Sequence, residues 1–117
     1  MNTQEFIATV LDAVPTLAAS LQEDEGLFSL QLGTFANHVQ SLIDGGASEE
    51  LKLCFSLVER ALRTGDPTLI NLVGVAFLEH LNFVDGKRHR SWALHCLQPL
   101  SIANLQALGR YPKGGKA

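Results

Sequence analysis

Residues 48–81 read SEELKLCFSLVERALRTGDPTLINLVGVAFLEHL, and this stretch decides the fold class. Its first half repeats apolar residues at spacings of three and four, the period of one face of an α-helix. Ser48 precedes two acids that a helix N-terminus favours, so we predict that Ser48 is an N-cap. Gly65 ends this helix, and Asp66 followed by Pro67 is typical of a cap with proline at the first helical position. The stretch therefore predicts two helices joined by a short turn, an antiparallel helical hairpin.

The helix predicted over residues 67–81 is apolar on nearly every side, whereas its neighbour over residues 48–64 is amphipathic. A helix that is hydrophobic all round is normally the central one of its domain. Phe77 lies in its most apolar part, so we expect Phe77 in the core. On the amphipathic helix we expect Glu59 and Arg60 to face water.

Two further segments with helical spacing precede the hairpin, over residues 6–21 and 28–43. Asn2 with Glu5 predicts a helix start, because the two side chains can form a capping box. Pro15 interrupts the first segment, and an interior proline removes a hydrogen bond and clashes with the preceding turn. We therefore expect a break there.

The segment over residues 28–43 is expected to begin as a helix near Gly33 or Thr34 and to end at Gly45 and Gly46, since glycine commonly follows the last helical turn.

The C-terminal third predicts two short helices. The first contains Trp92 and ends at Pro99. Ser101 is predicted to cap the second, which continues through Leu108. We expect residues 110–117 to form a frayed tail.

No segment shows the sustained alternation of apolar and polar residues that a half-buried strand needs. We therefore predict an all-α fold: five or six helices in a compact bundle of stacked antiparallel hairpins, similar to HEAT repeats. Residues 1–109 are expected to form one domain. The first ten residues lack a basic opening and no stretch is apolar enough to cross a bilayer, so we expect a cytoplasmic protein without a membrane partner.

Charge is distributed unevenly along the chain, although the formal net charge is only −3. Residues 1–50 carry eight acids and no lysine or arginine. Residues 86–117 carry six bases and no acid. Such polarity bears on partners and on rates of encounter, not on fold.

Sequence motifs for catalysis, cofactors or metals are absent. The chain has no glycine-rich phosphate loop, and its four histidines show no metal-ligand spacing. Cys54 and Cys96 form no CxxC pair, and both are expected to be buried thiols. We therefore expect no enzyme activity, no cofactor and no metal.

Two polar features have both a structural and a functional interpretation. Asn71 and Glu79 lie on one stripe along a mostly apolar helix. This stripe is either the exposed edge of the helix or a polar strip that contacts a partner. The string KRHRSW at 87–92 combines bases with an aromatic residue, a composition found in phosphate-binding patches. It is short and the chain is acidic overall, so a solvated helix start or an internal counterpart to the acidic half explains it better than nucleic-acid binding.

Residues 28–82 resemble small all-helical bacterial proteins of uncharacterised families found among toxin-immunity candidates. The resemblance depends on Gly65-Asp66-Pro67, on Asn71 and on Phe77-Leu78-Glu79. It implies a protein that neutralises a cognate bacterial toxin by stoichiometric binding. Nuclease toxins are usually basic because they bind phosphates, and an acidic inhibitor would associate with them faster.

The leading hypothesis is therefore an immunity protein that binds a basic, nuclease-type toxin through its acidic half. The alternative is a regulatory adaptor or an oligomeric scaffold, in which the acidic half of one protomer meets the basic end of another. The candidate partner-binding residues are Glu23, Asp24, Glu25, Glu49, Glu50, Asn71 and Glu79.

Overall fold

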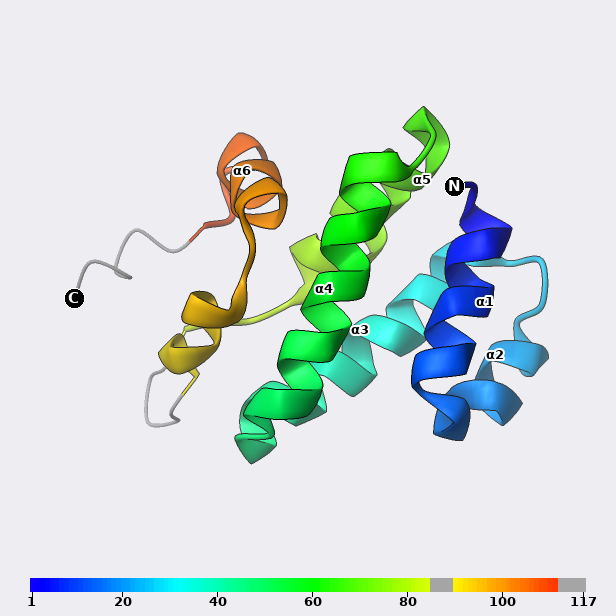
Figure 1. Cartoon of the computed structure of the whole chain (residues 1–117), viewed down its shortest axis with the longest axis horizontal. Helices are drawn as coiled ribbons and strands as arrows, with labels where there is room; N and C mark the ends of the chain where they lie inside the picture. Colours follow the sequence, from blue (N-terminus) through cyan, green and yellow to red (C-terminus); the bar gives the residue numbers. More distant parts are fainter. Residues whose placement is uncertain (85–89, 112–117) are drawn as a thin grey trace.

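The computed structural model describes residues 1–84 and 90–111. These residues form six α-helices and four short 3-10 or π segments, and no strand (Figure 1). The elements in chain order are α1 (Thr3–Ala13), η1 (Pro15–Leu17), α2 (Ala18–Glu23), α3 (Phe28–Gly45), α4 (Ser48–Thr64), α5 (Pro67–Leu72), η2 (Val73–Phe77), η3 (Leu78–His80), η4 (Ser91–Cys96) and α6 (Pro99–Ala107). The all-α prediction is confirmed for the described residues, whereas a HEAT-like stack of hairpins is not shown.

The core centres on three aromatic rings from three different elements. Phe35 of α3 meets Phe6 of α1 edge-on, with ring centroids 6.1 Å apart. On its other side Phe35 stacks on Phe77 of η2 at 4.9 Å. All three side chains are buried, as the apolar pattern predicted for Phe77. Offset and edge-to-face pairs add to the burial of apolar area, so this cluster joins the N-terminal helix to the central segment.

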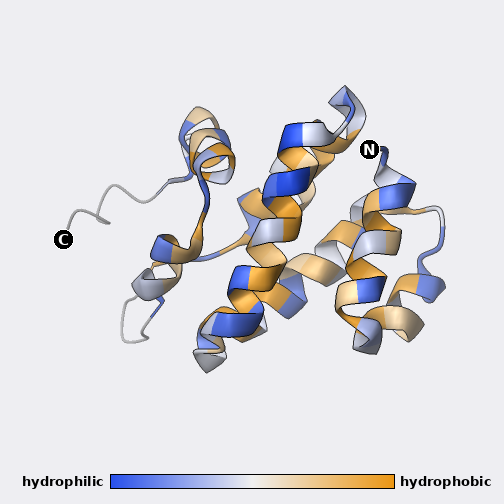
Figure 2. Cartoon of the chain, in the orientation of Figure 1, coloured by the Kyte–Doolittle hydropathy of each residue, from blue (hydrophilic) through white to orange (hydrophobic). Residues whose placement is uncertain are grey.

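Helix α4 shows its amphipathic pattern plainly, with hydrophilic and hydrophobic residues alternating around the ribbon (Figure 2). It contacts α1 and α3, and it also contacts η4 and α6 from the C-terminal third. Because these later elements pack on α4 as well, one of the residues predicted to face water is buried.

That residue is Glu59, which is only 6% exposed. Its carboxylate accepts hydrogen bonds from the main-chain N–H groups of Leu100 and Ser101, at 2.8 and 3.1 Å, and from the Ser101 hydroxyl. The prediction that Glu59 faces water was therefore wrong, because α6 packs over it. Ser101 is not an N-cap either: α6 begins at Pro99, and Glu59 accepts its first N–H groups instead.

The local start and stop signals of the first half are mostly confirmed. Asn2 and Glu5 form the predicted capping box, and α1 ends just before Pro15. The side chain of Asp66 accepts a hydrogen bond from the Leu69 N–H, with Pro67 at the first position of α5. These interactions span few residues, so the sequence pattern was sufficient to predict them.

Two predicted helix starts were wrong. Helix α3 begins at Phe28, and Gly33 lies inside it, because the apolar repeat already starts at Phe28 and packing outweighs the low helix propensity of glycine. Ser48 is the first residue of α4 and forms no side-chain cap. Gly46, with a φ of 72°, ends α3 as predicted and turns the chain so that the Ser48 N–H donates to its carbonyl oxygen.

The helix predicted over residues 67–81 is one continuous path with changing geometry. Its α-helical part ends at Leu72, followed by a π turn over Val73–Phe77 and a 3-10 turn over Leu78–His80. The π turn contacts both α3 and α4, and its residues other than Val75 are buried. The rest of the path is partly exposed, so the burial expected from its apolar composition is confirmed for this middle part only.

The N-terminus is joined to the turn between α4 and α5, which lies beside it in Figure 1. The amino group of Met1 donates to the Thr64 carbonyl at 2.8 Å, and the Asp66 N–H donates to the Met1 carbonyl at 2.9 Å. Among the described residues, no helix is both long enough and apolar enough to cross a membrane.

Candidate functional site

A pocket of about 410 Å³ opens at the corner where α1, α2 and α3 meet. This volume is within the range of small-ligand and side-chain pockets. Its walls are mainly apolar, and four polar residues interrupt them: Gln4, Gln22, Glu25 and Gln31. The residues that matter for its chemistry are Ile7, Leu11, Leu21, Phe28, Glu25 and Gln31.

One of the predicted binding residues, Glu25, lines this pocket, and Glu23 and Asp24 directly precede it in the chain. They end α2 and begin the loop to α3, in which Gly26 adopts a φ of 83°. Glu23 and Glu25 are exposed, and Asp24 is half-buried. The loop therefore brings the carboxylate of Glu25 to a mainly apolar pocket.

Exposed apolar side chains adjoin the same corner. Leu27 precedes the first residue of α3, Leu30 lies in its first turn, and each is 55% exposed. A pocket, exposed apolar residues and a charged rim together are features of protein-binding surfaces. Single exposed leucines are ordinary, but these two are chain neighbours of the lining residues Gly26, Phe28 and Gln31.

The amide of Gln31 is the polar group that sequence analysis missed. Its side chain is 5% exposed, and its Nε2 donates to the Leu21 carbonyl oxygen at 2.8 Å. Its Oε1 is buried and has no hydrogen-bond partner. Helical spacing could have placed it, since Gln31 lies three residues after Phe28 and four before Phe35, on the buried face of α3.

The other two predicted acids, Glu49 and Glu50, belong to a separate surface. Both are exposed in the first turn of α4. They follow the end of α3, whereas Glu23 and Glu25 precede its start; an 18-residue α-helix is about 27 Å long. Figure 1 shows α2 and the start of α4 far apart. The acids of the N-terminal half thus form two groups rather than one.

The stripe predicted through Asn71 and Glu79 is interrupted by the π turn, which changes the angular step between successive residues. Asn71 is exposed on α5, and Glu79 is half-buried in η3. Glu79 lines a second pocket, of about 550 Å³, together with Asn82, and Asn71 is not part of it. These two predicted residues are therefore not brought together.

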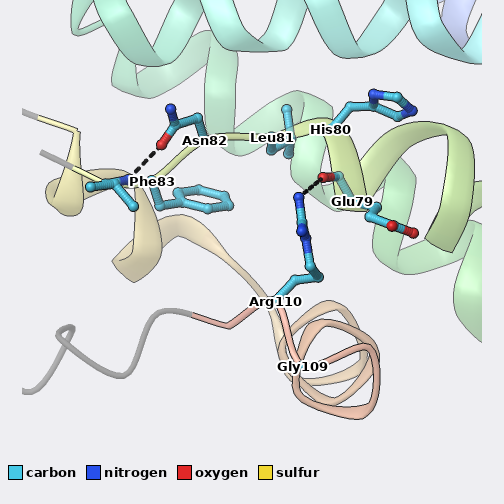
Figure 3. Close-up of a pocket in the computed structure, with 8 residues that line it drawn as sticks. Glu79, His80, Leu81, Asn82, Phe83, Gly109 and Arg110 are labelled. Atoms are coloured by element: carbon cyan, nitrogen blue, oxygen red, sulfur yellow. Dashed lines mark hydrogen bonds between the residues drawn. The ribbon is translucent and has the colours of Figure 1, made fainter.

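In this second pocket Arg110 reaches across from the end of α6. Its guanidinium donates to the main-chain oxygen of Glu79 at 3.1 Å, while the Glu79 carboxylate points elsewhere (Figure 3). Arg110, predicted to begin a frayed tail, thus contacts η3. Residues 112–117 of that tail lie outside the described residues.

The basic string is only partly described, because residues 85–89 lie outside the described ranges. Its last base, Arg90, forms an ion pair with Asp44 near the end of α3, with Nε and Oδ1 2.7 Å apart. This contact agrees with an internal counterpart to the acidic half. Trp92 is half-buried against the core.

Chemically reactive groups are few in the described part of the chain, which contains no cluster of three or more metal-ligating side chains. Cys54 is buried as expected, and burial, with a smaller contribution from the nearby charge of Glu50, raises the pKa of its thiol to about 11. Cys96 is only half-buried, contrary to expectation, and burial raises the pKa of its thiol against the opposing charge of Lys52. Neither thiol is activated as a nucleophile, which would require a lowered pKa.

Residues 7–106 match a family model described as a domain of unknown function, DUF7674. The chain belongs to this family. The DUF7674 match includes the pocket residues from Ile7 onward and nearly all of the helical domain. No curated protein and no solved structure matches the chain. The DUF7674 description names no activity or ligand, so it transfers none.

Proposed function

We propose that this protein is a non-catalytic protein-binding module that uses the corner formed by α1, α2 and α3 to bind a basic partner. The observation that carries the proposal is a mainly apolar pocket that the exposed acid Glu25 lines, with the exposed Glu23 two residues before it. Apolar contact area stabilises a complex, whereas surrounding charge mainly sets encounter rate and selectivity.

The biological role that we propose is that of an immunity protein, which neutralises a bacterial toxin by occupying its surface. Two features support this role: the resemblance described above and the acidic rim, which is complementary to a basic nuclease. The proposal needs no reactive group in the described residues. It also does not depend on a HEAT-like stack of hairpins, which stays a prediction from the sequence.

The proposed cognate partner acts inside the bacterial cell, so the proposed location is the cytoplasm. Asn71 and Glu79 remain candidate contacts of secondary importance, because they lie outside the pocket at the α1–α2–α3 corner.

The test begins with an affinity-tagged full-length chain that captures its partner from a lysate of the native host. The partner is identified by mass spectrometry, purified, and assayed for toxicity with and without the protein. Association rates are then measured across salt concentrations for the wild type and for the triple variant Glu23→Gln, Asp24→Asn, Glu25→Gln.

If the proposal is correct, the triple variant associates more slowly, its salt dependence is weaker, and its thermal midpoint is nearly unchanged. The matched control is Glu49→Gln with Glu50→Gln, which removes two exposed acids at the other end of α3. The control should leave association almost unaltered. An effect of the control but not of the triple variant would place the binding surface at the start of α4 instead.

The adaptor or scaffold hypothesis makes a different prediction in the same preparation. A chain that associates with itself through opposite charges forms oligomers that dissociate at high salt. Light scattering of the purified protein at low and high salt measures this, and a salt-sensitive oligomer without any toxin partner would contradict the immunity role.

A further inference from the structure

The segment that follows η3, residues 81–84, runs along the pocket of about 550 Å³. Leu81 has extended dihedral angles, with a φ of −79° and a ψ of 140°. Burial then alternates along the chain, because Leu81 and Phe83 are buried whereas Asn82 and Val84 are exposed. Such alternation is typical of a strand with one face on the core. The described part of the chain contains no strand that pairs with it.

One main-chain edge of this segment is occupied by a side chain of α3. The Asn82 N–H donates to Gln40 Oε1 at 2.8 Å. The Asn82 carbonyl oxygen accepts from Gln40 Nε2 at 3.2 Å. The carboxamide of Gln40 therefore pairs with Asn82 as the backbone of a neighbouring strand would.

The direction of the opposite edge follows from the geometry of the peptide group. In a planar trans peptide the C=O and the N–H point in opposite directions, and the described residues contain no cis peptide bond. Because the Asn82 N–H points to Gln40, the Leu81 carbonyl oxygen points away from it. The Phe83 N–H points away from Gln40 as well, because the Asn82 carbonyl oxygen points toward it. Neither group has a hydrogen-bond partner within residues 1–84 and 90–111.

This unpaired edge belongs to the wall of the pocket. Residues 79–84 line the pocket without interruption, and Gly109 and Arg110 at the end of α6 line it from the other side (Figure 3). One acceptor, on Leu81, and one donor, on Phe83, are thus left without partners along an extended segment. Main-chain groups of native proteins are rarely left unpaired, and an edge of this kind can pair with another chain.

Arg110 adds a positive charge to the opposite wall. Its guanidinium donates one N–H to the Glu79 carbonyl oxygen, whereas the Glu79 carboxylate points elsewhere (Figure 3). Its other N–H groups have no partner in the described part of the chain, and the side chain is exposed. A guanidinium with unpaired N–H groups favours a carboxylate.

We propose that residues 81–83 bind an extended peptide segment of another protein, which carries an acidic side chain facing Arg110. The main chain of this peptide donates to the Leu81 carbonyl oxygen and accepts from the Phe83 N–H, as in β-augmentation. A free carboxylate has no donor for Leu81, and an aliphatic group leaves both groups unpaired. A peptide supplies the donor and the acceptor together.

This inference goes beyond the proposed function, because it uses the side formed by η3 and α6 and not the α1–α2–α3 corner.

The test uses the peptide acetyl-Val-Glu-Val-Glu-amide and the full-length protein labelled with ¹⁵N. NMR follows the titration, and hydrogen exchange is measured for the Phe83 and Asn82 amides. In the free protein the Asn82 amide should exchange more slowly, since it is bonded to Gln40. Saturation with the peptide should slow exchange of the Phe83 amide about tenfold or more and leave that of Asn82 nearly unchanged.

Two further peptides separate main-chain pairing from charge. The same peptide with an N-methyl group on every residue lacks the main-chain donors of those residues and should bind about tenfold more weakly or worse. The peptide acetyl-Val-Lys-Val-Lys-amide should bind about fivefold more weakly or worse than the glutamate peptide.

Two variants locate the charge effect. Arg110→Gln should reduce the preference for the glutamate peptide to about twofold or less. Arg60→Gln removes another exposed arginine, on α4, and should retain the full preference. Far-ultraviolet circular dichroism and the thermal midpoint show that both variants are folded.

No binding of the glutamate peptide, or binding that leaves exchange of the Phe83 amide unchanged, would overturn the inference. Equal binding of the N-methylated peptide would do the same. Glutarate is titrated as a free dicarboxylate, and binding as tight as that of the peptide would show a small-anion site instead.

Exchange in the free protein tests two other occupants. A Phe83 amide that exchanges as slowly as Asn82 at every protein concentration would show that the edge is paired within the chain. Slow exchange that appears only as the protein concentration rises would identify a second copy as the occupant. Either result contradicts the inference.

Discussion

The carboxylate of Glu59 in α4 accepts hydrogen bonds from both the main-chain N–H and the hydroxyl of Ser101 in α6, 42 residues further along the chain. The first N–H groups of a helix have no partner within it, and a nearby side chain normally accepts from them. Here the acceptor comes from another helix. The negative charge also lies at the positive end of the α6 dipole, so Glu59 joins the C-terminal helix to the rest of the domain.

The first prediction follows from this contact. Glu59→Ala leaves the buried N–H of Ser101 and the N–H of Leu100 without an acceptor, which should lower the free energy of unfolding by about 2–4 kcal/mol. Urea unfolding followed by circular dichroism measures the loss. The matched control is Glu50→Ala, on the exposed side of the same helix, with an expected change of about 1 kcal/mol or less. Equal losses in the two variants would contradict the role given to Glu59.

The second prediction concerns the aromatic cluster. Phe77→Ala removes a fully buried ring that stacks on Phe35, so we expect a loss of about 3–5 kcal/mol in the free energy of unfolding. Phe77→Leu retains most of the apolar volume and should cost less. The exposed Leu27→Ala serves as control and should change stability by about 0.5 kcal/mol or less. A loss below about 1 kcal/mol for Phe77→Ala would be incompatible with the stacked core.

The third prediction compares two glycines. A Cβ on Gly65 would collide with the carbonyl oxygen of Ala61 in the last turn of α4 and press on Leu69 at 3.0 Å. Gly65→Ala should therefore destabilise the protein by about 1–3 kcal/mol. Gly33 lies inside α3 with open space around its Cβ position, so Gly33→Ala should stabilise it by about 0.5–1 kcal/mol. Thermal midpoints that shift in opposite directions would confirm the pair, and a shift in the same direction would refute it.

The fourth prediction concerns pH. Burial raises the pKa of the Cys54 thiol from 9.0 to about 11, so above pH 9 the unfolded chain loses this proton while the folded chain keeps it. The unfolded state then binds fewer protons, and stability falls as the pH rises from about 9 to about 11. Urea midpoints of the wild type and of Cys54→Ala at pH 8 to 11 test this. The wild type should lose stability more steeply, and parallel curves would show that Cys54 does not contribute.

The same burial predicts slow chemical modification. In the native protein at pH 8 a thiol reagent should label Cys96, which is half-buried, before Cys54. Labelling of Cys54 should accelerate when urea unfolds the chain. Peptide mapping by mass spectrometry distinguishes the two sites, and rapid native labelling of Cys54 would contradict its placement in the core.

The sequence by itself determined the helical fold class, the break at Pro15, the capping box of Asn2 and Glu5, and the start of α5 at Asp66 and Pro67. All of these depend on helical periodicity or on contacts within four residues, which local chemistry specifies. The sequence also showed the uneven charge and the apolar centre around Phe77.

The tertiary structure alone decided which polar groups became significant. Glu59 is buried because α6 packs over α4, and Gln31 is buried because α1 and α2 cover the start of α3. Charge counting placed all the N-terminal acids together, yet α3 separates Glu25 from Glu49 and leaves Glu25 beside the pocket. Contacts between residues distant in the chain depend on how helices pack against one another, and the pattern within each helix does not specify that packing.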